Sequence, residues 1–289
     1  MNDIELVVAY HERTKHAPNR YAASLGYMDW ATQPNPYRHY EGTLKTRLPL
    51  SFDNPTPPFH LLDVIDTAAP FCIDSISQFF QFSLGLAAFK RHGDQGWALR
   101  CNASSGNLQP TEAYLIAPHL TLEGYQIAHY APEHHELELL AHFDTNFFDA
   151  LPKGSFLVGV SSIAWREAWK YGERSFRYCQ LDAGHALQAL TVSAKMLGWN
   201  LQRFDVNMQE LDKLLGFNQR ERFIANERED ADMLLLVSPE IVSPPSISSL
   251  LNTLPNTFEG KVNQLSHKHH PWEVLDTIND ITHSDFITS

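Results

Sequence analysis

The spacing of apolar side chains predicts several helices along the chain. Residues 3–15 have near-helical apolar spacing that ends in a basic cluster, and residues 75–89 show a similar pattern. Residues 182–197 carry leucine and valine among small side chains, which predicts a buried helix. A shorter helix is predicted over residues 208–215, and a weaker spacing over residues 272–278 predicts a last short one.

Short apolar runs between these segments predict strands. A helix or a strand is expected to open near residues 109–114, because the pattern there fits both. The mixture of helices and strands indicates an α+β fold. The strands are expected at residues 97–100, 113–116, 124–130, 136–140, 155–161 and 233–238.

The distribution of proline, asparagine and tyrosine indicates how the chain is organised. At 289 residues, one larger domain with peripheral segments is the simplest expectation. A single domain is expected to cover residues 1–240. Within it, residues 18–60 show no sustained periodicity and are expected to form an irregular extension. Residues 241–289 predict a linker and a C-terminal tail.

The composition and the N-terminal sequence argue against several classes of function. A net charge of -12 would repel a phosphate backbone, so nucleic acid is not an expected partner. No window reaches the roughly 18 consecutive apolar residues that a membrane span needs. The N-terminus lacks the features of a secretory signal, which predicts a cytoplasmic protein. The 3 cysteines are widely spaced and are expected to be free thiols.

Two segments carry the strongest chemical signals. Residues 100–112 (RCNASSGNLQPTE) place small hydroxyl residues and a glycine in a row that can present N–H groups to an anion or a ring edge; a surface turn is the alternative. Residues 169–185 (WKYGERSFRYCQLDAGH) contain Lys170 and Tyr171, which can act as a base and a proton donor. The alternative for this segment is an Arg-rich turn followed by Asp182 as a helix N-cap.

A third segment, HERTKH at residues 11–16, concentrates positive charge in an acidic chain. Such a group can bind phosphate, and a solvated helix C-terminus is the alternative. No metal is expected despite 15 histidines, because adjacent imidazole rings rarely face one ion and no HExxH motif occurs. The chain also lacks the GxSxG and GxGxxG motifs of hydrolases and dinucleotide-binding domains.

Taken in order, these three segments resemble the FMN-dependent nitroreductase superfamily, and most of all its SagB-type thiazoline and oxazoline dehydrogenase branch. The run KYGERSFRYCQLDAGHALQ at residues 170–188 is the most specific match, and SSGNLQPTEAYLI at residues 104–116 is the next. The resemblance implies Lys170 and Tyr171 as the catalytic pair. It implies that FMN is bound by His11, Arg13, Lys15, Arg100, Ser104, Ser105, Gly106, Asn107 and Arg174.

The resemblance also implies a fold and a function. The expected fold is a central, mainly antiparallel sheet flanked by helices that forms a homodimer or an intramolecular pseudo-dimer. The expected activity is hydride transfer through FMN, with an azoline or other modified peptide or a small molecule as substrate and NAD(P)H as a reductant. A nitro- or quinone-reductase is an alternative.

Two departures from the family pattern favour a further alternative, a non-catalytic domain for dimerisation or peptide binding. Residues 234–242 (LLLVSPEIV) lack the family's basic residues after the last core strand. The tail LSHKHHPWEVLDTIN at residues 265–279 resembles the connector of tandem members. The chain is therefore expected to match the N-terminal half of such a protein.

Overall fold

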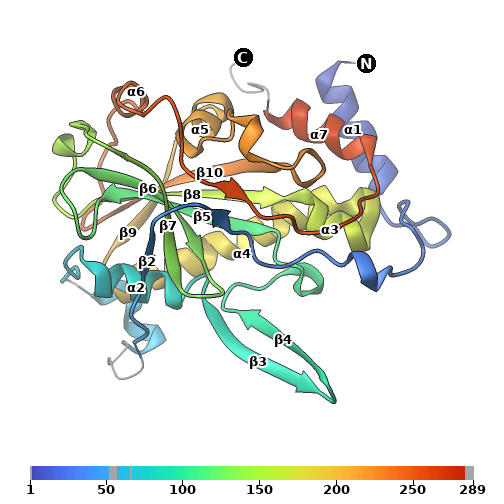
Figure 1. The fold of residues 1–289 in the computed structure, drawn as a ribbon, viewed down its shortest axis with the longest axis horizontal. Coiled ribbons are helices and arrows are strands. Elements are labelled where there is room, and N and C mark those ends of the chain that lie inside the picture. Colours follow the sequence, from blue (N-terminus) through green and yellow to red (C-terminus); the bar gives the residue numbers. More distant parts are fainter. Residues whose placement is uncertain (1, 52–56, 66, 284–289) are drawn as a thin grey trace.

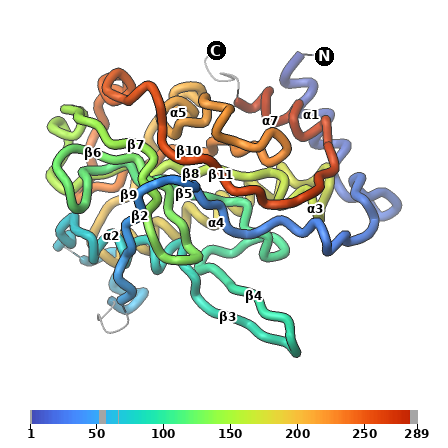
Figure 2. The backbone as a smooth tube through the Cα atoms, in the orientation of Figure 1, coloured from blue at the N-terminus to red at the C-terminus, as the bar shows by residue number. Residues whose placement is uncertain are grey.

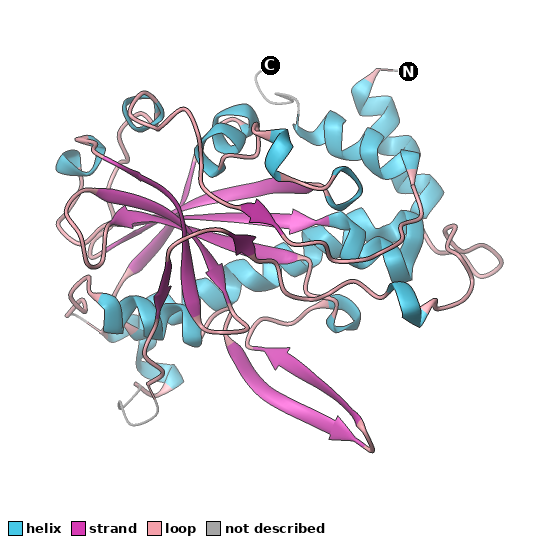
Figure 3. Cartoon of the chain, in the orientation of Figure 1, coloured by secondary structure: helices cyan, strands magenta, loops and turns pink. Residues whose placement is uncertain are grey.

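An antiparallel sheet forms the centre of the computed structural model, which describes residues 2–51, 57–65 and 67–283. Within these residues the sheet has 7 strands in the order β2-β7-β6-β5-β8-β10-β9, and they radiate through the middle of the molecule in Figure 3. Their bounds, in that order, are Lys45–Arg47, Glu136–Phe143, Tyr125–Ala131, Thr111–Pro118, Phe156–Ile163, Glu229–Ser238 and Asn200–Phe204.

Two helices cover one face of this sheet, α2 (Ile73–Gln81) and the long α4 (Ser175–Met196) (Figure 1). Aromatic side chains fill the layer between them and the sheet. Phe79 meets Phe156 edge to face at 5.5 Å, and Phe80 stacks on Tyr130 at 4.4 Å between ring centroids. Burying such large apolar surfaces is the dominant favourable term in folding.

The opposite face is covered by α5 (Met208–Leu215), α6 (Ser248–Leu251) and the small ladder of β1 (Tyr40–Glu41) with β11 (Lys261–Val262). Leu250 and Phe258, which belong to the segment predicted as a linker and tail, are buried in this core beside the sheet. The apolar positions of that segment are too far apart in sequence to show a regular period, so their packing was not visible in the pattern.

A third core lies at one end of the sheet, where α1 (Asp3–Thr14) packs against α7 (Glu273–His283) and α3 (Ala164–Tyr171) lies beneath. The tube in Figure 2 shows α1 and α7, the first and last described helices, side by side there. Asn2 starts α1 with a capping box, because its side chain accepts from the Glu5 N–H while the Glu5 carboxylate accepts from the Asn2 N–H.

A hairpin of β3 (Leu86–His92) and β4 (Gln95–Arg100) projects from the body of the molecule (Figure 3). The predicted helix over residues 75–89 is therefore wrong beyond Gln81, where helix gives way to this hairpin. In a short apolar run, periodicity alone cannot distinguish a strand from a helix. The ambiguous residues 109–114 open strand β5. Strand β9 was not predicted, and neither were β1 and β2 within the predicted irregular extension or β11 within the predicted tail.

The predicted helices near residues 3–15, 182–197, 208–215 and 272–278 are confirmed as α1, α4, α5 and α7, and the predicted strands as β4 to β8 and β10. The described residues also contain short 3-10 helices at Trp30–Thr32, Phe59–Val64, Ser105–Asn107, Phe147–Ala150, Gly172–Arg174, Arg220–Arg222 and Ala225–Glu227. Among the described helices, none combines the length and the hydrophobicity needed to cross a bilayer.

Candidate functional site

The loop that contains Ser104 and Ser105 is fastened to the middle of α4. The carboxylate of Asp182 accepts the Ser105 N–H at 3.0 Å and the Ser105 hydroxyl at 2.8 Å. Burial raises the pKa of Asp182, and the bonds from Ser105 oppose that rise. The alternative that made Asp182 a helix N-cap is wrong, because α4 begins at Ser175 and Asp182 lies two turns inside it.

Gly106 brings this loop against the Lys170-Tyr171 pair at the end of α3. Its φ of 61° is in the left-handed region, and a Cβ there would lie 2.8 Å from the Tyr171 hydroxyl and 2.9 Å from Lys170 Nζ. Only glycine permits this approach without displacing one of those groups. Two segments that are more than 60 residues apart in sequence, residues 104–107 and 170–171, therefore meet at the Gly106 backbone.

The residues after Gly106 are held in unusual backbone conformations. Asn107 and Gln109 both have positive φ, 59° and 55°. The Asn107 side-chain amide donates to the Ala98 carbonyl at 2.9 Å, and the Gln109 N–H donates to the Ser104 hydroxyl at 2.8 Å. Non-glycine residues with positive φ are uncommon and are maintained only where surrounding contacts stabilise them.

A buried carboxyl group, Glu167, lies one turn before Lys170 on α3. It is fully buried, and neither carboxyl oxygen has a hydrogen-bond partner among the described residues. Burial, aided by the Asp182 charge and opposed by Lys170, raises the pKa of Glu167 to about 9. The group is therefore protonated at neutral pH. Sequence reasoning missed Glu167, although its i, i+3 spacing from Lys170 is readable in the chain.

Tyr171 is the second titratable group of this cluster. Burial raises the pKa of Tyr171 to about 12, and the Glu167, Tyr178 and Asp182 charges add to the rise. Its ring centroid lies 4.2 Å from that of Tyr178, and Lys170 Nζ lies 5.2 Å from the Tyr171 ring centroid. At neutral pH the phenol is therefore a proton donor beside a cation.

A cavity of about 470 Å³ lies at the end of this loop, between residues 30–37, the β3–β4 hairpin and residues 107–109, and neither Lys170 nor Tyr171 lines it. Its walls include the aromatic rings of Trp30, Tyr37, Phe89 and Trp97 and the polar side chains of Arg100 and Gln109. Buried Nε of Arg100 and Oε1 of Gln109 have no hydrogen-bond partner within the described chain. The residues around the cavity thus combine aromatic rings with largely buried polar side chains.

Arg100 is anchored in the wall of this cavity. Its guanidinium donates to the Thr111 carbonyl at 3.1 Å and to the Pro36 carbonyl at 2.6 Å. The guanidinium carbon lies 5.9 Å from the centroid of the Tyr37 ring, and one nitrogen lies 4.0 Å from the Glu112 carboxylate. Arg100 is therefore a fixed, partly neutralised charge.

The basic segment at the end of α1 is paired within the protein. Arg13 forms a two-pronged ion pair with the buried carboxylate of Glu173, with Nε 2.9 Å from Oε2. Lys15 Nζ lies 3.0 Å from both oxygens of Glu12. These two cations, predicted from sequence as phosphate ligands, thus have carboxylate partners in the structure.

His11 and Arg174 lie beside that segment and are also engaged. The Arg177 guanidinium contacts His11 Nδ1 at 3.0 Å, and Arg174 donates to the Thr14 carbonyl. The Arg174 guanidinium carbon lies 5.4 Å from the centroid of Tyr178, and its buried Nε has no partner within the described residues. Through Tyr178, which contacts Tyr171, Arg174 borders the Lys170-Tyr171 cluster.

A chain of buried charged side chains contacts the loop at Gln109. Arg166 donates to the Gln109 carbonyl at 2.6 Å and pairs with Glu112, whose other oxygen contacts His129 at 3.0 Å. Burial alone would lower the pKa of His129, but its bonds to Glu112 and Glu138 outweigh that and raise it to about 9. These residues were not predicted, because they are separated along three strands and a helix.

Comparison with solved structures finds this fold in nitroreductases. A protein described as a nitroreductase from Anabaena variabilis has a TM-score of 0.65 and 20% identity, over 98% of this chain and 55% of the other. Another, from Ralstonia eutropha, has a TM-score of 0.51 and 14% identity, over 78% of this chain and 100% of the other. A chain of the E. coli microcin synthetase McbBCD complex with truncated pro-MccB17 bound has a TM-score of 0.45 and 15% identity, over 82% of each chain.

Neither a protein-family model nor a curated protein matches the chain. The structural matches establish that the chain has the nitroreductase fold, which confirms the predicted α+β architecture with an antiparallel sheet flanked by helices. The chain spans about 55% of the length of the Anabaena variabilis protein.

Proposed function

We propose that this protein is an FMN-dependent oxidoreductase of the nitroreductase type. The observation that carries the proposal is the contact of Gly106 with Lys170 and Tyr171, which joins the two segments with the strongest resemblance to that family. Because Gly106 has no Cβ, the Tyr171 hydroxyl and the Lys170 ammonium group can both lie against the loop backbone.

The residues around the adjacent cavity fit the ring system of a flavin. A volume of about 470 Å³ is within the range of small-molecule and cofactor pockets. Aromatic walls such as Trp97 can stack on a planar ring. Of the loop residues implied for FMN binding, Asn107 lines this cavity, and Ser104, Ser105 and Gly106 directly precede it.

Bound FMN would supply the hydride-transfer chemistry. The chain's own residues would manage protons and charge beside it. Lys170 would stabilise negative charge, and Tyr171 would donate a proton because its raised pKa keeps the phenol protonated. Glu167 would hold a further proton beneath Lys170. We propose an azoline or other modified peptide, or a small molecule, as the substrate and NAD(P)H as a reductant.

The visible spectrum of the purified protein, before and after denaturation, tests the proposal. Stoichiometric flavin released on unfolding, or tight binding of added FMN followed by quenching of its fluorescence, is the expected result. A colourless protein that also fails to bind added FMN would overturn it. A Lys170→Ala variant that binds FMN and retains full turnover would remove Lys170 from the catalytic pair.

A second candidate function is a non-catalytic domain that retains the fold for dimerisation or peptide binding. The observation that favours it is the pairing of Arg13 with Glu173 and of Lys15 with Glu12, which neutralises two cations proposed for the FMN phosphate. A homodimer, or a pseudo-dimer with a second domain, fits both candidates. Flavin-free protein that dimerises would favour the second.

A further inference from the structure

The turn between β6 and β7 directs two consecutive histidines to opposite sides. His135 has a φ of 51° and is buried, with Nδ1 2.8 Å from the Tyr130 hydroxyl and Nε2 2.7 Å from the Ser77 hydroxyl. His134 faces outward, with 55% of its side chain exposed. The two rings therefore do not share a site, and His134 is free to meet a residue from another part of the chain.

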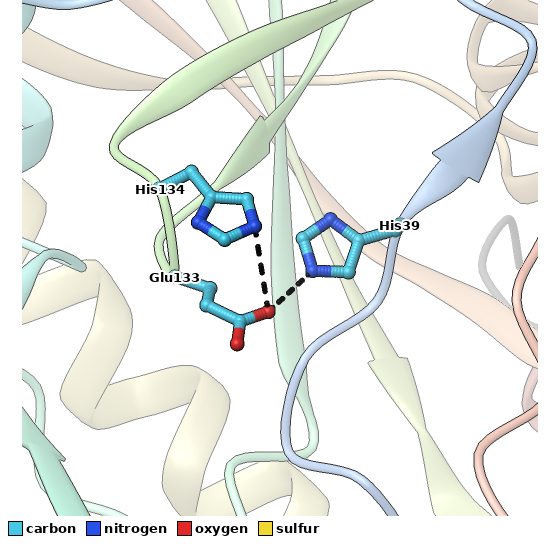
Figure 4. A group of neighbouring side chains, drawn as sticks. All are labelled: His39, Glu133 and His134. Atoms are coloured by element: carbon cyan, nitrogen blue, oxygen red, sulfur yellow. Dashed lines mark hydrogen bonds and ion pairs between the residues drawn. The ribbon is translucent and has the colours of Figure 1, made fainter.

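That residue is His39, which precedes β1. Figure 4 shows the rings of His39 and His134 facing the same carboxylate oxygen of Glu133. His39 Nε2 lies 2.7 Å and His134 Nε2 3.9 Å from Glu133 Oε2. One ligand atom from each residue lies within 4.8 Å of the other two. The two rings are nearly parallel, 23° apart, with centroids separated by 5.4 Å.

These separations match the needs of a small divalent ion. Two ligand atoms bound at about 2.0–2.1 Å to a tetrahedral zinc ion lie about 3.3 Å apart. The measured separations of 2.7 and 3.9 Å fall on either side of that value. Rotations of the partly exposed His134 and Glu133 side chains would adjust these separations toward that value.

A second carboxylate orients His39 for this role. Its Nδ1 lies 3.2 Å from Oε1 of the fully buried Glu138. Glu138 is itself held by the Tyr40 N–H at 2.8 Å and by His129 Nδ1 at 3.0 Å. With Nδ1 donating to Glu138, the Nε2 hydrogen that the Glu133 carboxylate accepts at 2.7 Å is the one that a metal ion would replace. A carboxylate behind a histidine is the usual support of a metal-binding imidazole.

The neighbouring group of His39, Glu136 and Glu138 does not offer the same opportunity. Lys45 Nζ lies 2.8 Å from Glu136 and 3.0 Å from Glu138, so an ammonium group already contacts both carboxylates. By contrast, no lysine or arginine of the described chain forms an ion pair with Glu133. The Lys45 ammonium would repel a metal cation at that group, and the Glu133 carboxylate has no such neighbour among the described lysines and arginines.

We propose that His39, Glu133 and His134 bind a Zn²⁺ ion, with a fourth position open to solvent. Two imidazole nitrogens and one carboxylate oxygen form a donor set that suits zinc better than magnesium, which prefers oxygen ligands. The ion would fasten the segment before β1 to the β6–β7 turn. This site is independent of the proposed flavin function and departs from the expectation, drawn from sequence, of no metal.

Calorimetric titration of the chelator-treated protein with ZnCl2 tests the site. We expect one ion per chain, a rise in melting temperature with ZnCl2 and none with MgCl2, because a ligand that binds only the folded state stabilises it. The His134→Ala variant should bind zinc at least about tenfold more weakly. His92→Ala, at an exposed histidine of the β3–β4 hairpin, is the matched control and should bind like the wild type.

Because His134 is largely exposed, its replacement should leave the far-UV circular dichroism and the metal-free melting temperature unchanged. Equal zinc affinity in the wild type and His134→Ala would overturn the proposal, as would the absence of zinc binding at millimolar concentration. Glu133→Gln provides a second variant, for which the same loss of affinity is expected.

Discussion

Asp182 and Ser105, 77 positions apart in sequence, are joined by hydrogen bonds from both the N–H and the hydroxyl of the serine to one carboxylate. This contact fastens a loop to the middle of the longest described helix. Because Gly106 follows Ser105 directly, the same contact sets the distance between the loop backbone and the Lys170-Tyr171 pair.

Replacing Asp182 with asparagine should weaken the attachment of the loop. The amide keeps one acceptor but turns a donor group toward the Ser105 donors, so the free energy of unfolding should fall by about 1–3 kcal/mol. Ser105→Ala removes only the hydroxyl bond and should cost about 1 kcal/mol. Urea denaturation measures both changes. An unchanged urea midpoint in Asp182→Asn would show that the contact does not stabilise the fold.

Gly106→Ala tests the close approach at the site. Its Cβ would meet the Tyr171 hydroxyl and Lys170 Nζ at under 3 Å, in a backbone conformation that alanine disfavours. We expect FMN affinity to fall at least about tenfold and stability to fall by about 1–3 kcal/mol. Gly184→Ala is the matched control, because Gly184 lies inside α4 with open space around it; it should stabilise the protein by about 0.5–1 kcal/mol. FMN binding by Gly106→Ala at wild-type affinity would remove Gly106 from the flavin site.

Glu167 should make stability depend on pH. Its pKa is raised from 4.5 to about 9 in the folded protein, so the folded state keeps a proton that the unfolded chain releases. The resulting stabilisation is complete below pH 4.5 and is lost as the pH rises through 9. Glu167→Gln has no such proton, so its stability relative to the wild type should increase between pH 5 and pH 9. Urea midpoints at several pH values measure the difference, and parallel curves would contradict the raised pKa.

The Arg13-Glu173 ion pair distinguishes the two candidate functions. If Arg13 binds the FMN phosphate, Glu173→Gln should free its guanidinium and increase FMN affinity several-fold, while Arg13→Gln should decrease it. Lys15→Gln, on the same helix end and paired with the exposed Glu12, shows the effect of removing a more distant charge. Fluorescence titration with FMN measures all three variants. Equal affinities in Glu173→Gln and Arg13→Gln would mean that Arg13 does not contact the phosphate.

The sequence by itself determined the elements with strong local signals. The capped first helix, the buried helix rich in alanine and leucine, and most central strands were predicted, because their apolar periods depend only on neighbouring residues. The Ser-Ser-Gly-Asn loop and the Lys170-Tyr171 pair were also singled out as candidates, since glycine and paired polar residues carry local meaning, and their role in binding or catalysis stays a prediction. Residues 82–89 were misassigned because a short apolar run fits helix and strand equally well.

Only the tertiary structure decided which side chains meet. The neutral state of Glu167 depends on the layers that bury it, and the pairing of Arg13 with Glu173 joins residues 160 positions apart. Likewise, His134 faces His39 and not its neighbour His135, because a residue with positive φ turns the second ring inward. Such contacts arise from the register of strands and the packing of helices, and neither is encoded in a local pattern of residues.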